Sequence, residues 1–159
     1  MMSASLSGAK TRESVELFHS LFGLDVKAAK VAAFEPYSIA RYVDEDGVTA
    51  AFLSCDLATA CRLGAALTHI PSGRVSEAIA EKKIPDVLAE NLSEVFNIGV
   101  SLVSPPDGRR IVLDRVVHGP ESAQFESFAV EMSLRPQSAA AFEISRYGNC
   151  QLIFGVQHG

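Results

Sequence analysis

Basic residues are few in this chain and never form a run. The 159 residues include 14 Lys and Arg against 19 Asp and Glu, which leaves a net charge of −5. No basic cluster is longer than the pairs Lys82-Lys83 and Arg109-Arg110. Nucleic-acid binders need a concentrated positive patch to contact phosphates, so no DNA or RNA partner is expected. An acidic chain is better suited to a partner with a basic or metal-containing site.

Long apolar runs are also absent, although 48% of the residues are hydrophobic. No stretch approaches the ~20 apolar residues that a membrane-spanning helix needs, so no membrane partner is predicted. The first ten residues are small and polar and lack the hydrophobic segment of a secretory signal. These features predict a cytoplasmic protein with a single domain over 1–159, of which residues 1–10 are expected to be loose.

Cysteine is scarce, and its spacing matches no metal or redox motif. Cys55, Cys61 and Cys150 are odd in number and form no C-x-x-C pair. The four histidines are scattered far from them along the chain, so no zinc site is predicted. We expect three free thiols, as in a reducing cytoplasm, that pack as small apolar side chains.

The order of the predicted elements indicates an α+β fold. Helices are predicted at 12–23, 56–69, 76–81 and 84–103, and strands at 38–43, 48–54, 110–117, 125–134 and 151–156. Because strands and helices are segregated along the chain, we expect a largely antiparallel sheet with long helices packed on one side. The helix at 56–69 is rich in Ala and Gly, so another segment is expected to pack very close to it. Pro85 is expected at the first position of the helix at 84–103.

The predicted helix at 84–103 carries polar side chains in a pattern that chemistry could use. An apolar stripe centred on Leu92 lies on one side, because positions three and four apart share a helix face. Glu90, Glu94, Asn97 and Ser101 fall on the opposite side, with no basic residue among them. Most polar residues on an outer helix face only solvate it. Here, however, Glu90 and Glu94 repel each other with no Lys or Arg on the helix to relieve them, and Asn97 is an indifferent helix former.

A carboxylate and a carboxamide three residues apart project side by side from a helix. The carboxylate of Glu94 can pair with a lysine of another protein, and the amide of Asn97 can hydrogen-bond a water and orient it. Neither group is a nucleophile, and no His or Cys in the helix could act as one. The pair therefore fits a helix that completes another protein's active site better than it fits a self-contained enzyme.

The segment 91–98, Asn-Leu-Ser-Glu-Val-Phe-Asn-Ile, resembles the signature helix of the CheC/CheX/FliY family of chemotaxis phosphatases. That family carries Asp or Ser, then three residues, Glu, two residues, Asn, and a proline further on. Glu94, Asn97 and Pro120 match the Glu, the Asn and the proline. The segment 56–71 resembles the helix before the signature, and 12–26 resembles the opening of CheX-like members.

The resemblance implies a CheX-like α+β fold with a single site made of Glu94 and Asn97. In the family, this helix docks on a phosphorylated response regulator, where the Glu pairs with a lysine beside the phosphoaspartate and the Asn positions the attacking water. Carried over, Glu94 is the docking residue and Asn97 the water-orienting residue in hydrolysis of the aspartyl phosphate of a CheY-like response regulator. The metal is Mg²⁺ held by the regulator, and no cofactor is expected on this chain.

This sequence departs from the family pattern in three places. Glu90 stands where the family has Asp or Ser, which adds a negative charge near an anionic phosphoryl group. Gly99 follows Asn97 earlier than in two-site members, and Glu16-Leu17-Phe18-His19 fits an ordinary exposed helix turn better than a decayed second motif. The sequence therefore leaves open a non-catalytic interaction or scaffold module, which Glu90 favours. It also leaves open a structural homodimer in which the polar helix face is buried.

Overall fold

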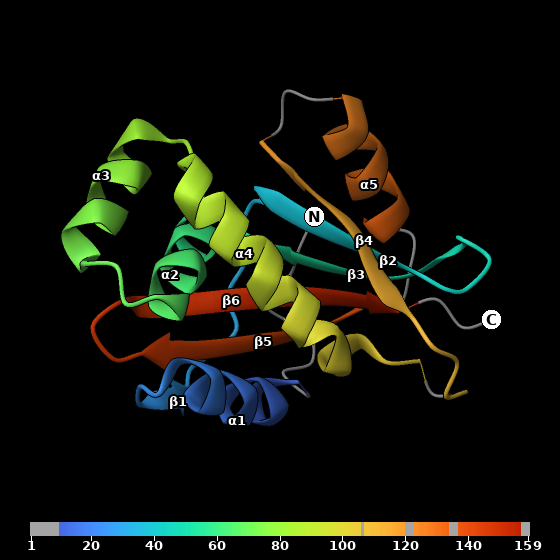
Figure 1. Ribbon diagram of the computed structural model, residues 1–159, viewed down its shortest axis with the longest axis horizontal. Helices are drawn as coiled ribbons and strands as arrows, with labels where there is room; N and C mark the ends of the chain where they lie inside the picture. Colours follow the sequence, from blue (N-terminus) through green and yellow to red (C-terminus); the bar gives the residue numbers. More distant parts are fainter. Residues whose placement is uncertain (1–9, 106, 120–122, 134–136, 157–159) are drawn as a thin grey trace.

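The computed structural model describes residues 10–105, 107–119, 123–133 and 137–156. They form a six-stranded sheet in the order β1-β5-β6-β3-β2-β4, in which all neighbouring strands are antiparallel (Figure 1). The strands are β1 (Val26–Ala28), β2 (Ser38–Val43), β3 (Thr49–Cys55), β4 (Val112–His118), β5 (Gln137–Ile144) and β6 (Gly148–Val156). The helices are α1 (Thr11–Phe22), α2 (Leu57–Leu67), α3 (Ser72–Glu81), α4 (Asp86–Ile98), the 3₁₀ helix η1 (Gly99–Val103) and α5 (Ala123–Ser133). The predicted α+β fold with an antiparallel sheet is confirmed.

The sheet has a different hydrophobic cluster on each face. Helices α1 to α4 and η1 share the larger cluster, into which β2 sends Ala40 and Tyr42. The smaller cluster contains Ile39 from the same strand together with side chains of α5. Successive strand residues point to opposite faces, which is why neighbours on β2 belong to different clusters. Consequently α1 to α4 lie on one side, as expected, and α5, which is as long as α2, lies on the other.

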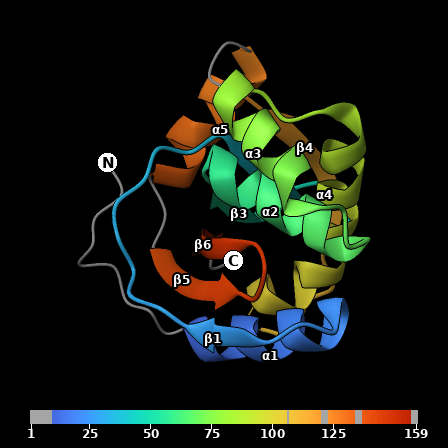
Figure 2. The same ribbon diagram turned by 90° about the vertical axis from the view of Figure 1, so that its left-hand side faces the viewer.

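The connection between β1 and β2 runs along one side of the molecule (Figure 2). Its residues Val31 and Phe34 pack against the smaller cluster, next to the side chains of α5. The backbone amide of Ala32 donates to the Gln151 side chain on β6 at 2.6 Å. This connection therefore helps α5 to cover the second face of the sheet.

The strand predicted at 125–134 is wrong, because α5 occupies 123–133. Residue 134 lies outside the described residues. Phe125, Phe128 and Met132 are buried at helical spacing and pack on Ile39, Phe52 and neighbouring side chains of the smaller cluster. Phe and Val are strand-favouring residues, but a second sheet face that needs an apolar cover selects the helix. The strands β1 and β5 were not predicted, whereas those at 38–43, 48–54, 110–117 and 151–156 are confirmed with shifts of a few residues.

Helices α2 and α4 pack with their backbones in contact. A methyl group placed on Gly64 of α2 would overlap the carbonyl oxygen of Leu88 on α4. Asn91 of α4 donates from its side-chain amide to the Gly64 carbonyl at 2.9 Å and to the Thr68 hydroxyl at 3.0 Å. The close approach expected from the Ala- and Gly-rich segment 56–69 is confirmed. Asp56 caps α2, since its carboxylate accepts the Thr59 amide at 2.8 Å.

The single helix predicted at 84–103 is two helices in succession. α4 ends at Ile98, and η1 continues in 3₁₀ geometry from Gly99. Glycine is a poor residue for a helix interior, which favours the change at this position. Pro85 is the N-cap residue rather than the first helical residue, and its carbonyl accepts the Ala89 amide at 2.9 Å.

Other expectations concern the termini and the cysteines. Residues 1–9 lie outside the described residues, whereas the Lys10 carbonyl already accepts the Ser14 amide at the start of α1. The three cysteines are free and buried, as expected. No helix within the described part of the chain is long and apolar enough to cross a bilayer.

Candidate functional site on helix α4

Glu94 and Asn97 lie one turn apart on the exposed face of α4. Glu90 and Ser101 are exposed as well, whereas Leu92 on the opposite face is buried. Helix α4 is continuous through Glu94 and Asn97, and the change to 3₁₀ geometry comes after both. Ser101 lies beyond that change. The outward position expected for these side chains is confirmed, and their chemical role remains a prediction.

The polar groups of this face are free for a partner. Within the described ranges, no hydrogen bond or ion pair engages the side chain of Glu90, Glu94 or Asn97. Helix α4 contains no Lys or Arg that could neutralise the two glutamates. Asn91 differs from Asn97, because its amide is used twice against α2. The structure therefore accounts for one asparagine of the helix and leaves the other without an internal role.

The last turn of α4 is anchored to the sheet by Tyr42. The hydroxyl of Tyr42 donates to the carbonyl of Phe96 at 2.6 Å, and the whole Tyr42 side chain is buried. Burial raises the pKa of the Tyr42 phenol, so it remains a donor at all ordinary pH values. Phe96 directly precedes Asn97, so this bond holds the backbone from which the Asn97 side chain departs.

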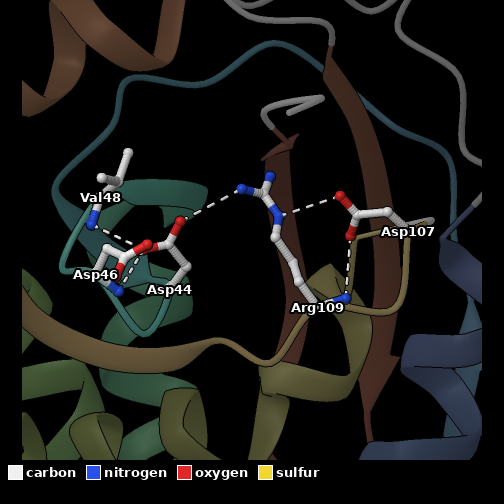
Figure 3. Close-up of polar contacts among 5 residues, drawn as sticks. All are labelled: Asp44, Asp46, Val48, Asp107 and Arg109. Carbon is white, nitrogen blue, oxygen red and sulfur yellow. Dashed lines mark hydrogen bonds and ion pairs between the residues drawn. The ribbon is translucent and has the colours of Figure 1, made fainter.

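Arg109 ties the segment after η1 to the turn between β2 and β3 (Figure 3). Its guanidinium lies 3.5 Å from Asp44 and 3.5 Å from Asp107. The other oxygen of Asp44 accepts the backbone amides of Asp46 at 2.9 Å and Val48 at 3.0 Å. This cluster closes a turn and holds the exit of η1, so it has a structural role. The strand expected to begin at 110 begins at Val112.

The histidines among the described residues contact neighbouring backbone or side-chain groups and do not contribute to the polar face of α4. His69 contacts the Phe22 carbonyl at the end of α1 at 2.7 Å, and His19 contacts the Leu24 carbonyl at 2.8 Å. His118 at the end of β4 contacts the Ser38 hydroxyl at 2.7 Å, and burial lowers the pKa of its imidazole. No group of three or more His, Cys, Asp or Glu within the described segments is arranged to hold a metal ion. Pro120, the proline of the resemblance, lies outside the described residues.

Comparison with known proteins gives a structural match only. No family model and no curated protein matches the sequence. The FliM middle domain from H. pylori superimposes with a TM-score of 0.52 at 14% identity, covering 94% of this chain and 86% of that one. This chain shares the fold of a FliM middle domain. Lower TM-scores are found for a chain of the CheX–CheY–BeF₃–Mg²⁺ complex from Borrelia burgdorferi (0.48, 12% identity, 90% and 92% covered) and for the FliM middle domain from Vibrio alginolyticus (0.45, 12% identity, 92% and 88% covered).

Proposed function

We propose that this chain hydrolyses the aspartyl phosphate of a CheY-like response regulator by placing α4 against the phosphorylated site of the regulator. The observation that carries the proposal is the pair Glu94 and Asn97, exposed one turn apart and without internal partners in the described structure. The likeness of segment 91–98 to the signature helix of the CheC/CheX/FliY family supports the same assignment. The FliM-like fold is compatible with it.

In this proposal the chain positions the reacting groups and supplies no nucleophile of its own. The carboxylate of Glu94 would pair with a lysine of the regulator and hold the helix in place. The side-chain amide of Asn97 would hydrogen-bond a water and align it with the bond between phosphorus and the aspartyl oxygen. The water oxygen then bonds to phosphorus, the bond to the aspartyl oxygen breaks, and the products are inorganic phosphate and a free carboxylate. Mg²⁺ on the regulator would neutralise the developing charge.

Glu90 favours a second candidate function, a non-catalytic docking module for the same kind of regulator. It is exposed on the same helix, one turn before Glu94. Beside Glu94, Glu90 would bring a second carboxylate toward the phosphoryl oxygens if the helix entered the phosphorylated site, and like charges in close contact are unfavourable. In this alternative, α4 binds the regulator but leaves the lifetime of its phosphate unchanged.

The test measures phosphate loss and binding separately. Loss of phosphate is followed for CheY-like response regulators of the same organism, phosphorylated by a small phosphodonor, with and without the purified chain. Binding is measured with the same regulators loaded with Mg²⁺ and beryllofluoride, an unreactive mimic of the aspartyl phosphate. We expect Asn97→Ala to lower the rate at saturation by about 10²-fold with binding retained, and Glu94→Ala to weaken binding. Glu77→Ala, which removes an exposed charge from α3, is the matched control.

The outcomes separate the alternatives. Faster phosphate loss that depends on Asn97 supports the phosphatase. Binding without a change in lifetime selects the docking module. If neither activity nor binding is seen and Glu94→Ala changes the oligomeric state instead, the exposed face of α4 is a subunit contact and both functions are wrong.

A further inference from the structure

The end of α4 needs partners for its carbonyl groups. The last four carbonyls of an α-helix have no donor within the helix, and here the Gly99 amide serves only those of Val95 and Asn97. The Phe96 carbonyl lies between them and receives the hydroxyl of Tyr42. The backbone on either side of the Asn97 peptide is therefore held by two different elements, the start of η1 and the strand β2.

Tyr42 is itself held in place by the sheet. It lies opposite Ala51 of β3 and Leu113 of β4, so both edges of its strand are paired. Its side chain is 0% exposed, so the neighbouring core side chains fix the ring. Because the strand and the ring are both fixed, the position of the hydroxyl defines where the Phe96 carbonyl must point.

We propose that Tyr42 is a positioning residue for Asn97, which fixes the rotation of the last turn of α4 and with it the direction of the Asn97 side chain. This inference rests on the proposed phosphatase function. Without the hydroxyl, the turn before Gly99 can rotate toward the 3₁₀ geometry that η1 already has. Glu94 lies one turn earlier, close to the Asn91 bonds with α2, and is not released by the same change.

The structure offers a control for removing one tyrosine hydroxyl that donates to a backbone carbonyl. The Tyr147 hydroxyl donates to the Ile70 carbonyl at 2.6 Å, the same length as the bond from Tyr42 to Phe96. The Ile70 carbonyl follows α2 and is not part of α4. Tyr42→Phe and Tyr147→Phe therefore remove the same kind of bond, and only the first should affect catalysis.

The experiment separates rate from affinity in the dephosphorylation assay described above. We expect Tyr42→Phe to lower the rate at saturation roughly tenfold, less than the about 10²-fold that a displacement of about 1 Å can cause, with an unchanged half-saturating concentration. Tyr147→Phe should leave both quantities unchanged. Equal losses in the two variants, or no loss in Tyr42→Phe, would overturn the inference.

A second measurement does not depend on activity. Amide hydrogen exchange of residues 97–101 should be faster in Tyr42→Phe than in the wild type and unchanged in Tyr147→Phe. If the wild type fails to dephosphorylate any regulator, the proposed function is wrong, and the exchange result still decides whether Tyr42 fixes this turn. If Tyr42→Phe does not fold, the wild-type protein supplies the test, because the buried hydroxyl proton of Tyr42 should be observable by NMR. Its rapid exchange with solvent would overturn the inference.

Discussion

Replacing Gly64 by alanine tests whether the position of α4 is set by backbone contact with α2. The added methyl group would overlap the Leu88 carbonyl oxygen and lie 3.2 Å from the carbonyl carbon and 3.3 Å from the Cα atom of the same residue. All three atoms belong to the backbone, so no side chain can rotate away. The two helices must move apart, which also stretches the hydrogen bond from Asn91 to the Gly64 carbonyl.

The expected loss of stability is the balance of three contributions. Alanine is a better helix former than glycine by about 1 kcal/mol, which stabilises the variant. Overpacking a tight contact destabilises by about 1–3 kcal/mol, and a backbone-to-backbone overlap belongs at the upper end of that range. A weakened hydrogen bond adds about 0.5–1.5 kcal/mol. The net loss is therefore about 2.5–3.5 kcal/mol, or a fall in Tm of about 5–14 °C for a chain of this size.

The assay is thermal and urea unfolding of Gly64→Ala beside Gly73→Ala. Gly73 lies in α3, where an added methyl group would meet nothing within 4 Å. This control should be unchanged or more stable by up to about 1 kcal/mol. A Gly64→Ala protein as stable as the wild type would refute the reasoning that the backbones of α2 and α4 fix each other. Because Glu94 and Asn97 move with α4, the variant should also dephosphorylate the regulator more slowly.

Three further predictions concern charge, pH and thiol reactivity. Glu90→Ser should speed dephosphorylation and stabilise the fold by about 0.2–0.5 kcal/mol, since it removes repulsion with Glu94; an unchanged rate at low salt would argue against α4 entering the phosphorylated site. Burial lowers the pKa of His118 below its usual 6.5, so the unfolded chain takes up the proton first and stability falls as the pH drops below that value. Between about pH 7.5 and about pH 5, an interval that spans the usual histidine pKa, the Tm of the wild type should therefore fall further than that of His118→Asn. Equal falls in Tm would contradict this. Burial raises the pKa of the thiols of Cys55, Cys61 and Cys150, that of Cys61 to about 11. An alkylating reagent at neutral pH should therefore modify these cysteines only after the protein unfolds.

The fold was predicted correctly where the local conformational preference of a segment agrees with the conformation that tertiary packing requires. Asp56 before an Ala- and Gly-rich segment predicted both the start of α2 and its close neighbour, and the structure shows a capping bond and the contact at Gly64. Gly23 was expected to end the first helix, and it has a positive φ of 67° after Phe22. These signals depend on a few neighbouring residues and on glycine geometry, which a sequence displays directly.

Where tertiary contact overrides local preference, the prediction failed. The residues of β5 include three consecutive alanines, a helix-favouring run, yet 139–141 are 1% exposed or less in a strand between β1 and β6. Small side chains are needed there because both faces of the strand are covered. Phe125 and Phe128 favour strands but sit on a helix that shields Phe52 on the second face of the sheet. Which segments cover each face of the sheet cannot be predicted before the strand order is known.

The exposed positions of Glu94 and Asn97 were predicted more completely than the sheet, because they depend on one helix, whereas their chemical role stays a prediction. The period of α4 alone placed Glu94 and Asn97 outside and Leu92 inside, and the structure agrees. Tyr42 could not have been found in this way. It is 54 residues from Phe96 in the sequence, and only the pairing of β2 within the sheet brings its hydroxyl beneath α4.

The position of β6 has a consequence for how the protein is made. Although it is the last described strand, it lies between β5 and β3, so β3 keeps an open edge until residues 148–156 have left the ribosome. The backbone amide of Gln151 on β6 also donates to the Thr59 hydroxyl of α2, the helix on which α4 rests. During synthesis α2 and α4 are therefore complete long before β6, the strand that contacts α2. Sequence-distant pairings of this kind make folding slow. Protection of nascent chains from aggregation is therefore expected to matter most while that edge is unpaired.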